Sequence, residues 1–337
     1  MKIALIRLSA LGDIIQSSIV LQFIKKKQPE AEIDWFVDER FKGILEAHPL
    51  INTLYALPLK DKKILSSLKM LLSAKKKEYD LVIDLQGLLK SALIARILSS
   101  NAYGFDRKSL KEVMASFFYK HKAFVPYKEN IILRNIYLLG FVLDCFFDKA
   151  EILTKKPCFE ADESLQKKLL KKLKLAKCNV LIHTGSSTAN KNYPKERLSI
   201  LSQMILSSYE ETKIWLCWGN EEERSFCEFI LKDSAREGIF ILPKLSLQEL
   251  SAFTALCDLI IGNDSGPTHL AFAMNKPSIT IFGATPSYRN AYQTPINKII
   301  DSGKFISDPK HIDKNDFCIQ SIDERQIFDH VKALLGS

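Results

Sequence analysis

Two short segments, far apart in the chain, combine residue types that could carry out group-transfer chemistry. Residues 3–13 run from an apolar stretch into Gly12-Asp13, and residues 259–269 run from an apolar stretch into a group of small and polar residues. Each pattern predicts a buried strand, a turn and the start of a helix. Open α/β sheets bind their ligands beyond such turns, at the carboxyl ends of the strands. We therefore expect one candidate site in each half of the chain.

The first turn presents a carboxylate, Asp13. A carboxylate at the edge of a sheet could act as a general base that removes a proton from a hydroxyl group. Aspartate is also common in the first turn of a helix, because its charge opposes the positive end of the helix dipole. A catalytic and a structural interpretation of Asp13 therefore both stay open at this point.

The second turn has the composition of a phosphate site. Pro267 suits the first helical position, Gly266 allows a ligand to approach the backbone closely, and Ser265 and Thr268 add hydroxyl groups. The amides at a helix N-terminus attract anions, and Asp264 and His269 flank this one. The alternative is a well-capped helix with a buried histidine.

Two further segments follow predicted strands. Residues 183–191 contain hydroxyl groups, a glycine and Lys191, which suit a pyrophosphate, although a solvated polar loop has the same composition. Residues 218–224 contain three consecutive glutamates, which could accept hydrogen bonds from ribose or simply favour a helix N-terminus. The chain has no GxGxxG after the first strand of either half and no Walker A motif. Both absences argue against NAD, FAD or a P-loop.

The first half is rich in cations. Gln86 and Lys90 follow a predicted strand, and the other basic residues there include Lys60, Lys62, Lys63, Arg107, Lys108, Lys111, Lys120, Lys122 and Arg134. Together with a formal net charge of +9, they indicate an anionic acceptor or a membrane surface. A nucleic-acid partner is not expected, because the basic stretches lack interleaved aromatic residues and any known binding motif.

Strands and helices alternate over all 337 residues, which is typical of a doubly wound α/β fold in two domains. A polar stretch at about 153–163 has the character of a linker. Ser109 and Glu112 have capping-box spacing and predict a helix start. The seven cysteines show no metal-binding spacing. With no stretch long enough to span a bilayer, we expect a cytoplasmic protein, at most peripheral to a membrane.

Four segments resemble the bacterial heptosyltransferases of glycosyltransferase family nine. They are residues 8–14, 79–92, 111–119 and 263–270. The first and last are shared across that family, whereas the middle two favour the members that add the first heptose of the lipopolysaccharide core. The resemblance implies a GT-B fold, in which two Rossmann-like domains face a cleft. We expect an acceptor domain at 1–155, a donor domain at 165–318, and a helix at 319–337 that returns to the first domain.

The resemblance also implies an activity. Heptose would pass, with inversion and without a metal or other cofactor, from ADP-heptose to the Kdo residue of Kdo-lipid A at the cytoplasmic face of the inner membrane. Asp13 would be the catalytic base and Lys191 would stabilise the departing diphosphate. The implied donor ligands are Ser186, Ser187, Thr188, Lys191, Glu221, Asp264, Ser265, Gly266 and His269, with Glu222 a rival to Glu221. The implied acceptor ligands are Ser9, Gly12, Lys60, Lys62, Lys63, Gln86, Lys90, Lys111 and Arg134.

Two other functions stay open. One is a heptosyltransferase that adds its sugar to an existing heptose instead of to Kdo. The abundance of lysine in the first half favours the Kdo acceptor, because Kdo carries a carboxylate. The other is a protein that binds a nucleotide sugar without catalysis, against which Gly12-Asp13 argues.

Overall fold

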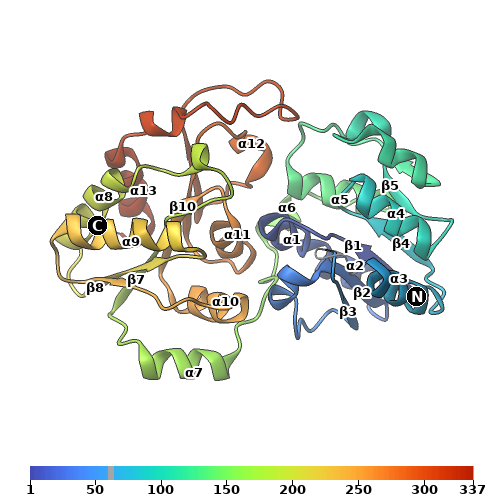
Figure 1. The fold of residues 1–337 in the computed structure, drawn as a ribbon, viewed down its shortest axis with the longest axis horizontal. Helices are drawn as coiled ribbons and strands as arrows, with labels where there is room; N and C mark the ends of the chain where they lie inside the picture. Colours follow the sequence, from blue (N-terminus) through green and yellow to red (C-terminus); the bar gives the residue numbers. More distant parts are fainter. Residues whose placement is uncertain (60–63, 337) are drawn as a thin grey trace. The chain divides into compact units, whose positions relative to one another are not determined.

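The computed structural model describes residues 1–59 and 64–336, so that the predicted acceptor ligands Lys60, Lys62 and Lys63 lie outside the described residues. The chain divides into two compact units, Met1–Cys158 and Phe159–Ser337. Each unit contains a parallel sheet of six strands covered by helices (Figure 1). The predicted doubly wound α/β class is confirmed.

The first unit orders its strands β3-β2-β1-β4-β5-β6. Their bounds are β1 Lys2–Ile6, β2 Glu32–Asp38, β3 Thr53–Leu57, β4 Leu81–Asp84, β5 Tyr103–Phe105 and β6 His121–Ala123. Central strand β1 pairs with both β2 and β4, with Ile3 opposite Ile33 on one side and Leu81 on the other. The chain reverses its direction across the sheet at β1, which is where open α/β sheets place ligands.

Two helical layers cover this sheet. One contains α1 (Leu11–Ser17), α2 (Ile19–Lys27) and α5 (Ile131–Val142), which contact one another, and short α6 (Ala150–Leu153) follows them. The other contains α3 (Ile64–Lys75), α4 (Leu89–Leu98) and the 3₁₀ helix η3 (Val113–Phe118). Right-handed crossovers require this separation, because the chain moves one way across the sheet after β1 and the other way after β3.

The second unit repeats the same strand order. Its sheet runs β12-β11-β10-β7-β8-β9, so β7 occupies the place of β1 and β10 that of β4. The strands are β7 Cys178–His183, β8 Thr212–Cys217, β9 Ile239–Ile241, β10 Leu259–Asn263, β11 Ser278–Phe282 and β12 Asn297–Asp301. The helices are α7 Glu163–Lys172, α8 Lys195–Ser208, α9 Glu221–Ser234, α10 Leu247–Leu256, α11 Gly266–Ala273, α12 Ser287–Asn290 and α13 Glu324–Leu335.

The strands that carry the candidate turns form the centre of each core. Residues 3–6 of β1 and 259–261 of β10 are 0% exposed. Parallel sheets covered by helices on both faces need such continuous apolar strands, and this is why both segments lack polar alternation. The two turns are thereby attached to strands that lie at the buried centre of each unit.

The last helix packs within the second unit. Ile327 and Val331 of α13 are 0% exposed and join the core cluster around β10 and β11. Arg197 of neighbouring α8 forms an ion pair with Glu324, with 2.7 Å between Nη1 and Oε2. The amphipathic pattern of α13 is thus satisfied by α8 and the second sheet. The return of residues 319–337 to the first domain, expected from the sequence, stays a prediction.

The predicted capping box at Ser109 and Glu112 is wrong. The Glu112 carboxylate accepts a hydrogen bond from the Leu89 amide at 2.7 Å, and so serves the start of α4. Ser109 is held by Asp106, whose Oδ1 accepts bonds from its amide and its hydroxyl. The spacing was right for a cap, but both side chains have partners elsewhere.

A buried carboxylate, Asp84, shapes the turn after β4. Its Oδ1 accepts bonds from the amides of Gln86 and Gly87 at 2.8 and 3.1 Å, while Oδ2 accepts from Ser91 and Tyr119 at 2.7 and 2.6 Å. Burial raises the pKa of Asp84, and these four hydrogen bonds act in the opposite direction. Asp84 therefore fixes the path of Gln86, which reaches the first candidate site.

We expect Tyr119→Phe to destabilise the first unit by about 1–3 kcal/mol, because it removes a hydroxyl donor from the buried Asp84 without changing the ring. Urea unfolding followed by circular dichroism measures the change in the free energy of unfolding. A loss below about 0.3 kcal/mol would show that the Tyr119–Asp84 bond does not stabilise this turn.

Candidate functional site

The first candidate site lies at the carboxyl end of β1, where α1 presents Asp13. Arg7 reaches it with 2.9 Å between Nη2 and Oδ1, and the Asp13 Oδ2 accepts the Ala10 amide at 3.2 Å. Arg7 is itself fixed, because its Nη1 donates to the Leu85 carbonyl at 2.7 Å. The Arg7 side chain is 6% exposed and that of Asp13 is 41% exposed. A buried cation thus orients a carboxylate that is open to solvent, as a general base requires.

Gln86 connects this loop to the neighbouring strand. Its Oε1 accepts bonds from the amides of Leu8 and Ser9 at 2.7 and 3.3 Å. Ser9 and Gly12, predicted to contact the acceptor, are half-buried in the same loop. The structure therefore brings Ser9, Gly12, Asp13 and Gln86 together, with the side-chain oxygen of Gln86 engaged in holding the backbone.

The predicted basic ligands of this unit separate into different environments. Lys90 and Lys111 are exposed. Lys90 is the second residue of α4, which follows β4, and it therefore lies toward the carboxyl edge of the sheet. Burial raises the pKa of Asp38, at the end of β2, but Arg40 and, more weakly, Lys90 lower it below its usual value.

Arg134 differs from the expectation of an acceptor ligand. It is 4% exposed, its guanidinium donates to the carbonyls of Ser109, Val125 and Pro126 at 2.8–2.9 Å, and it stacks over the Phe105 ring. Buried backbone carbonyls need hydrogen-bond donors inside the fold, and Arg134 supplies donors to three of them.

The second candidate site is built around Asp264, directly after β10. Its Oδ2 accepts bonds from Lys191 Nζ at 2.6 Å, Thr285 at 3.0 Å and Asn290 at 3.3 Å. Its Oδ1 lies 3.0 Å from Nε2 of His269. Burial alone would raise the pKa of Asp264, but Lys191 and His269 overcome this effect and hold it well below its ordinary value. Asp264 is therefore an ionised, buried anchor for a lysine.

The predicted anion cradle surrounds this anchor. The first backbone hydrogen bond of α11 runs from the His269 amide to the Ser265 carbonyl at 3.3 Å. The amides of Gly266 and Thr268 come before this bond, at the helix N-terminus where an anion would bind. Thr268 has its hydroxyl at 2.9 Å from the Asn263 carbonyl, which fixes the helix start to β10. Ser265 lies 3.3 Å from Nδ1 of His183, at the end of neighbouring β7. Burial lowers the pKa of His183.

The loop after β7 delivers the lysine. Ser186 is tied to Asn192, with 2.7 Å between its hydroxyl and Oδ1. Thr188 is half-buried and Ser187 is exposed. The short 3₁₀ helix η4 (Ala189–Lys191) then turns Lys191 toward Asp264. An ammonium group, helix amides and hydroxyls converge at the carboxyl ends of β7 and β10, and this combination suits a diphosphate.

The glutamates after β8 have different positions from one another. Glu221 and Glu222 are exposed, whereas Glu223 accepts the Gly219 amide at 2.6 Å and lies 4.0 Å from the His183 ring. A Cβ at position 185 would overlap the Glu223 carboxyl group, so Gly185 is required for this approach.

Sequence reasoning missed Thr285 and Asn290, and it did not distinguish Glu223 from the two glutamates before it. Asn220 caps α9, and its spacing to Glu223 is a helix-start signal that could have identified Glu223 as engaged. Thr285 and Asn290 follow β11, and only the strand order brings them to Asp264.

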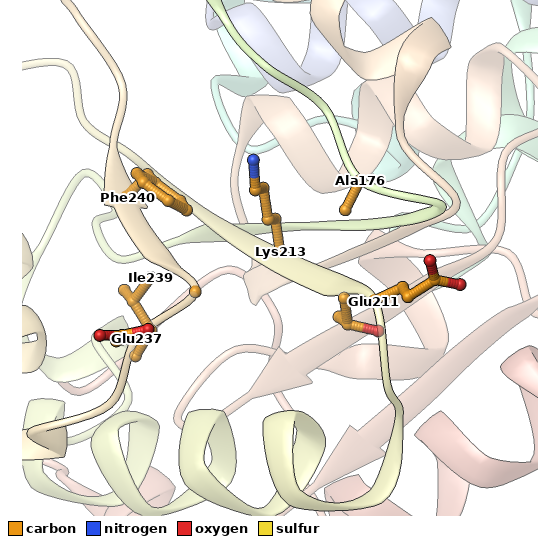
Figure 2. A pocket seen from close by; sticks show the side chains of 8 residues that line it. Ala176, Glu211, Lys213, Glu237, Ile239 and Phe240 are labelled. Carbon is orange, nitrogen blue, oxygen red and sulfur yellow. The ribbon is translucent and has the colours of Figure 1, made fainter.

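Other features of the described residues lie away from this chemistry. No three His, Cys, Asp or Glu side chains of residues 1–59 and 64–336 gather as a metal site would require. No helix in these ranges is both apolar and long enough to cross a membrane. Figure 2 shows a pocket lined by Lys213, Glu237 and Phe240, at the amino ends of β8 and β9 and thus at the opposite edge of the sheet from Asp264.

Comparisons with known proteins place this geometry in a family. Residues 68–307 match glycosyltransferase family 9 (heptosyltransferase). The chain is 56% identical over 340 residues to lipopolysaccharide heptosyltransferase 1 of Campylobacter coli, covering 100% of this chain and 99% of that protein.

Solved structures show the same fold. One is the E. coli heptosyltransferase WaaC with ADP-2-deoxy-2-fluoro heptose (TM-score 0.74, 20% identity, 98% of this chain and 99% of that one). Another is E. coli ADP-heptose LPS heptosyltransferase II (TM-score 0.75, 19% identity, 99% and 98%). These likenesses confirm the predicted GT-B fold class. With the family match over most of its length and a relative at 56% identity, the chain belongs to glycosyltransferase family 9, the heptosyltransferases.

Proposed function

We propose that this glycosyltransferase moves heptose from ADP-heptose to the Kdo residue of Kdo-lipid A, with inversion and without a metal. The observation that carries the proposal is the 56% identity, over the whole chain, to a protein named lipopolysaccharide heptosyltransferase 1. The two candidate sites supply residues for each part of the reaction. The surface of the membrane's inner leaflet would be a further partner, because the acceptor is a lipid.

The second unit is proposed to bind the donor. The amides before the first bonded turn of α11, the Lys191 ammonium and the hydroxyls of Ser187 and Thr188 would hold the diphosphate. Asp264 would keep Lys191 in place by its 2.6 Å ion pair. The exposed Glu221, with Glu222 as its rival, would accept from the ribose hydroxyls, since Glu223 is already engaged by Gly219.

The first unit is proposed to bind the acceptor and start the reaction. Asp13 would take the proton of a Kdo hydroxyl, and the resulting oxygen would attack the anomeric carbon of heptose. The bond from that carbon to the diphosphate oxygen would break on the opposite face, and ADP would leave with the electron pair. Lys191 and the α11 amides would stabilise the negative charge that grows on the diphosphate. The exposed Lys90 and Lys111 would attract the acceptor's anionic groups.

A transfer assay with two acceptors tests the function. We expect product from ADP-heptose and Kdo-lipid A, and none from a core that already carries one heptose. We also expect the same rate in EDTA as without it. Product on the heptosylated core alone would make the protein an enzyme of the second heptosyl transfer, and a rate that requires an added divalent metal would contradict the metal-free mechanism.

Replacing the base should affect chemistry and not donor binding. We expect Asp13→Asn to lower kcat by about 10³-fold, because it removes the proton acceptor while keeping the side-chain shape. ADP affinity, measured by isothermal titration calorimetry, should stay within about twofold. Asp80→Asn is the matched control, because Asp80 binds the Lys2 amide at the opposite edge of the same sheet. Equal kcat in the two variants would remove Asp13 from the mechanism.

Removing the anchored lysine should affect donor binding. We expect Lys191→Ala to weaken ADP binding by about tenfold or more, because a charge-assisted contact to the diphosphate is lost. Lys213→Ala, at the amino end of β8, is the control and should bind ADP normally. If the two variants bind ADP equally well, the diphosphate does not contact Lys191.

A further inference from the structure

The helical layer of α3, α4 and η3 leaves apolar side chains on its outer side. In α3, Leu71 and Ala74 are buried, whereas Leu68 and Leu72 on the other side are 38% and 49% exposed. In α4, Ala92 and Ala95 are buried, and Leu89 and Leu93 are 41% and 50% exposed. In η3, Met114 and Phe117 are 62% and 75% exposed.

These side chains share one surface. The chain crosses the sheet in the same direction after β3 and after β4, which places α3 and α4 on the same face of it. The two helices contact each other (Figure 1). Helix α4 also contacts η3. Because the buried residues of each element point to the sheet, their exposed residues point away from it together. We call this surface the outer layer face, defined by Leu68, Leu72, Leu89, Leu93, Met114 and Phe117.

The charges on α3, on α4 and in the segment around η3 are almost all positive. Helices α3 and α4 carry Lys69, Lys75, Lys90 and Arg96, with no acidic residue. Residues 107–122 add five Lys and Arg residues and one acidic residue, Glu112, which is committed to the Leu89 amide. Isolated exposed leucines are ordinary in soluble proteins, but exposed apolar residues grouped on elements whose charges are nearly all positive are not.

We propose that the outer layer face docks on the surface of an anionic lipid bilayer, with Phe117 and Met114 inserted among the lipids and the cations among the headgroups. The charge pattern selects this occupant, since an excess of Lys and Arg next to apolar residues is what anionic membranes recognise. A second copy of the chain would place two sets of lysines against each other. The inference rests on the proposed function, in which the acceptor is a lipid.

The position of this face also suits such an acceptor. Leu89, at the start of α4, follows Gln86 by three residues, and Gln86 binds the Leu8 and Ser9 amides of the Asp13 loop. The outer layer face therefore begins at the edge of the sheet that carries Asp13. A lipid-linked sugar could reach the carboxylate while its acyl chains remain in the bilayer.

Vesicle flotation with the full chain tests the proposal. We expect the protein to float with vesicles of phosphatidylcholine and phosphatidylglycerol and to stay behind with vesicles of phosphatidylcholine alone. High salt should weaken the binding, because it screens the lysines. No binding to either vesicle, or equal binding to both, would overturn the proposal.

Matched variants distinguish binding through this face from nonspecific adsorption of exposed apolar residues. We expect Met114→Ser/Phe117→Ser to lower binding by about tenfold or more. The control is Phe146→Ser/Leu153→Ser, whose side chains are 79% and 56% exposed in the opposite layer, after α5 and at the end of α6. The control should bind within about twofold of the natural chain. Equal losses in the two double variants would overturn the proposal.

A charge variant and two further readouts complete the test. Lys69→Glu/Lys108→Glu should lose binding to the anionic vesicles with an unchanged thermal midpoint, and normal binding by this variant would contradict the role of charge.

If sedimentation velocity showed a dimer that Met114→Ser/Phe117→Ser abolishes, the face would belong to a second copy instead. Transfer to a deacylated acceptor should be unchanged in Met114→Ser/Phe117→Ser. If the natural chain bound the anionic vesicles but transferred no heptose, the proposed function would be refuted and the docking proposal would stand.

Discussion

The site of the second unit depends on one buried charge, the carboxylate of Asp264. A carboxylate that is 7% exposed is stable only if cations and hydrogen-bond donors replace the water that it has lost. Four side chains do so, and they come from three parts of the unit: Lys191 before α8, His269 in α11, and Thr285 and Asn290 after β11. The need to satisfy Asp264 is thus what draws these segments to one point.

The two units have the same strand order, and each must hold two loops at the point where the chain reverses its direction across the sheet. In each, the strand beside the central one at the reversal ends in a polar residue that is almost fully buried: Asp84 at the end of β4, and Asn263 at the end of β10. Asp84 binds the amides of its own turn, whereas Asn263 Oδ1 accepts the Tyr193 amide from the loop after β7. The shared fold positions two loops at the reversal point, and the residue at the strand end decides how they are held.

The sequence predicted the parts of the sites that follow directly from strand–turn–helix patterns. Asp13 and residues 264–269 lie where their strands predicted them, because a buried strand and a proline-started helix leave the turn little freedom. The sequence could not predict that Arg134 is buried, because an arginine that donates to carbonyls inside the fold has the same appearance in sequence as a surface cation. Glu112 shows the same limit, since its partner, the Leu89 amide, is 23 residues away.

The placement of charge distinguishes the two units. In the second, the side chain of Lys191 is 18% exposed and paired with Asp264, so its charge is balanced within the fold. In the first, the buried Arg7 is paired in a similar way with Asp13, but the lysines of α3, α4 and residues 107–122 stand outward with almost no acid beside them. Charges balanced inside a site give orientation, whereas unbalanced charges on a face give attraction over distances of about a Debye length. On the functions proposed above, the second unit would orient a small anion, and the first would add a means of attracting a large anionic surface.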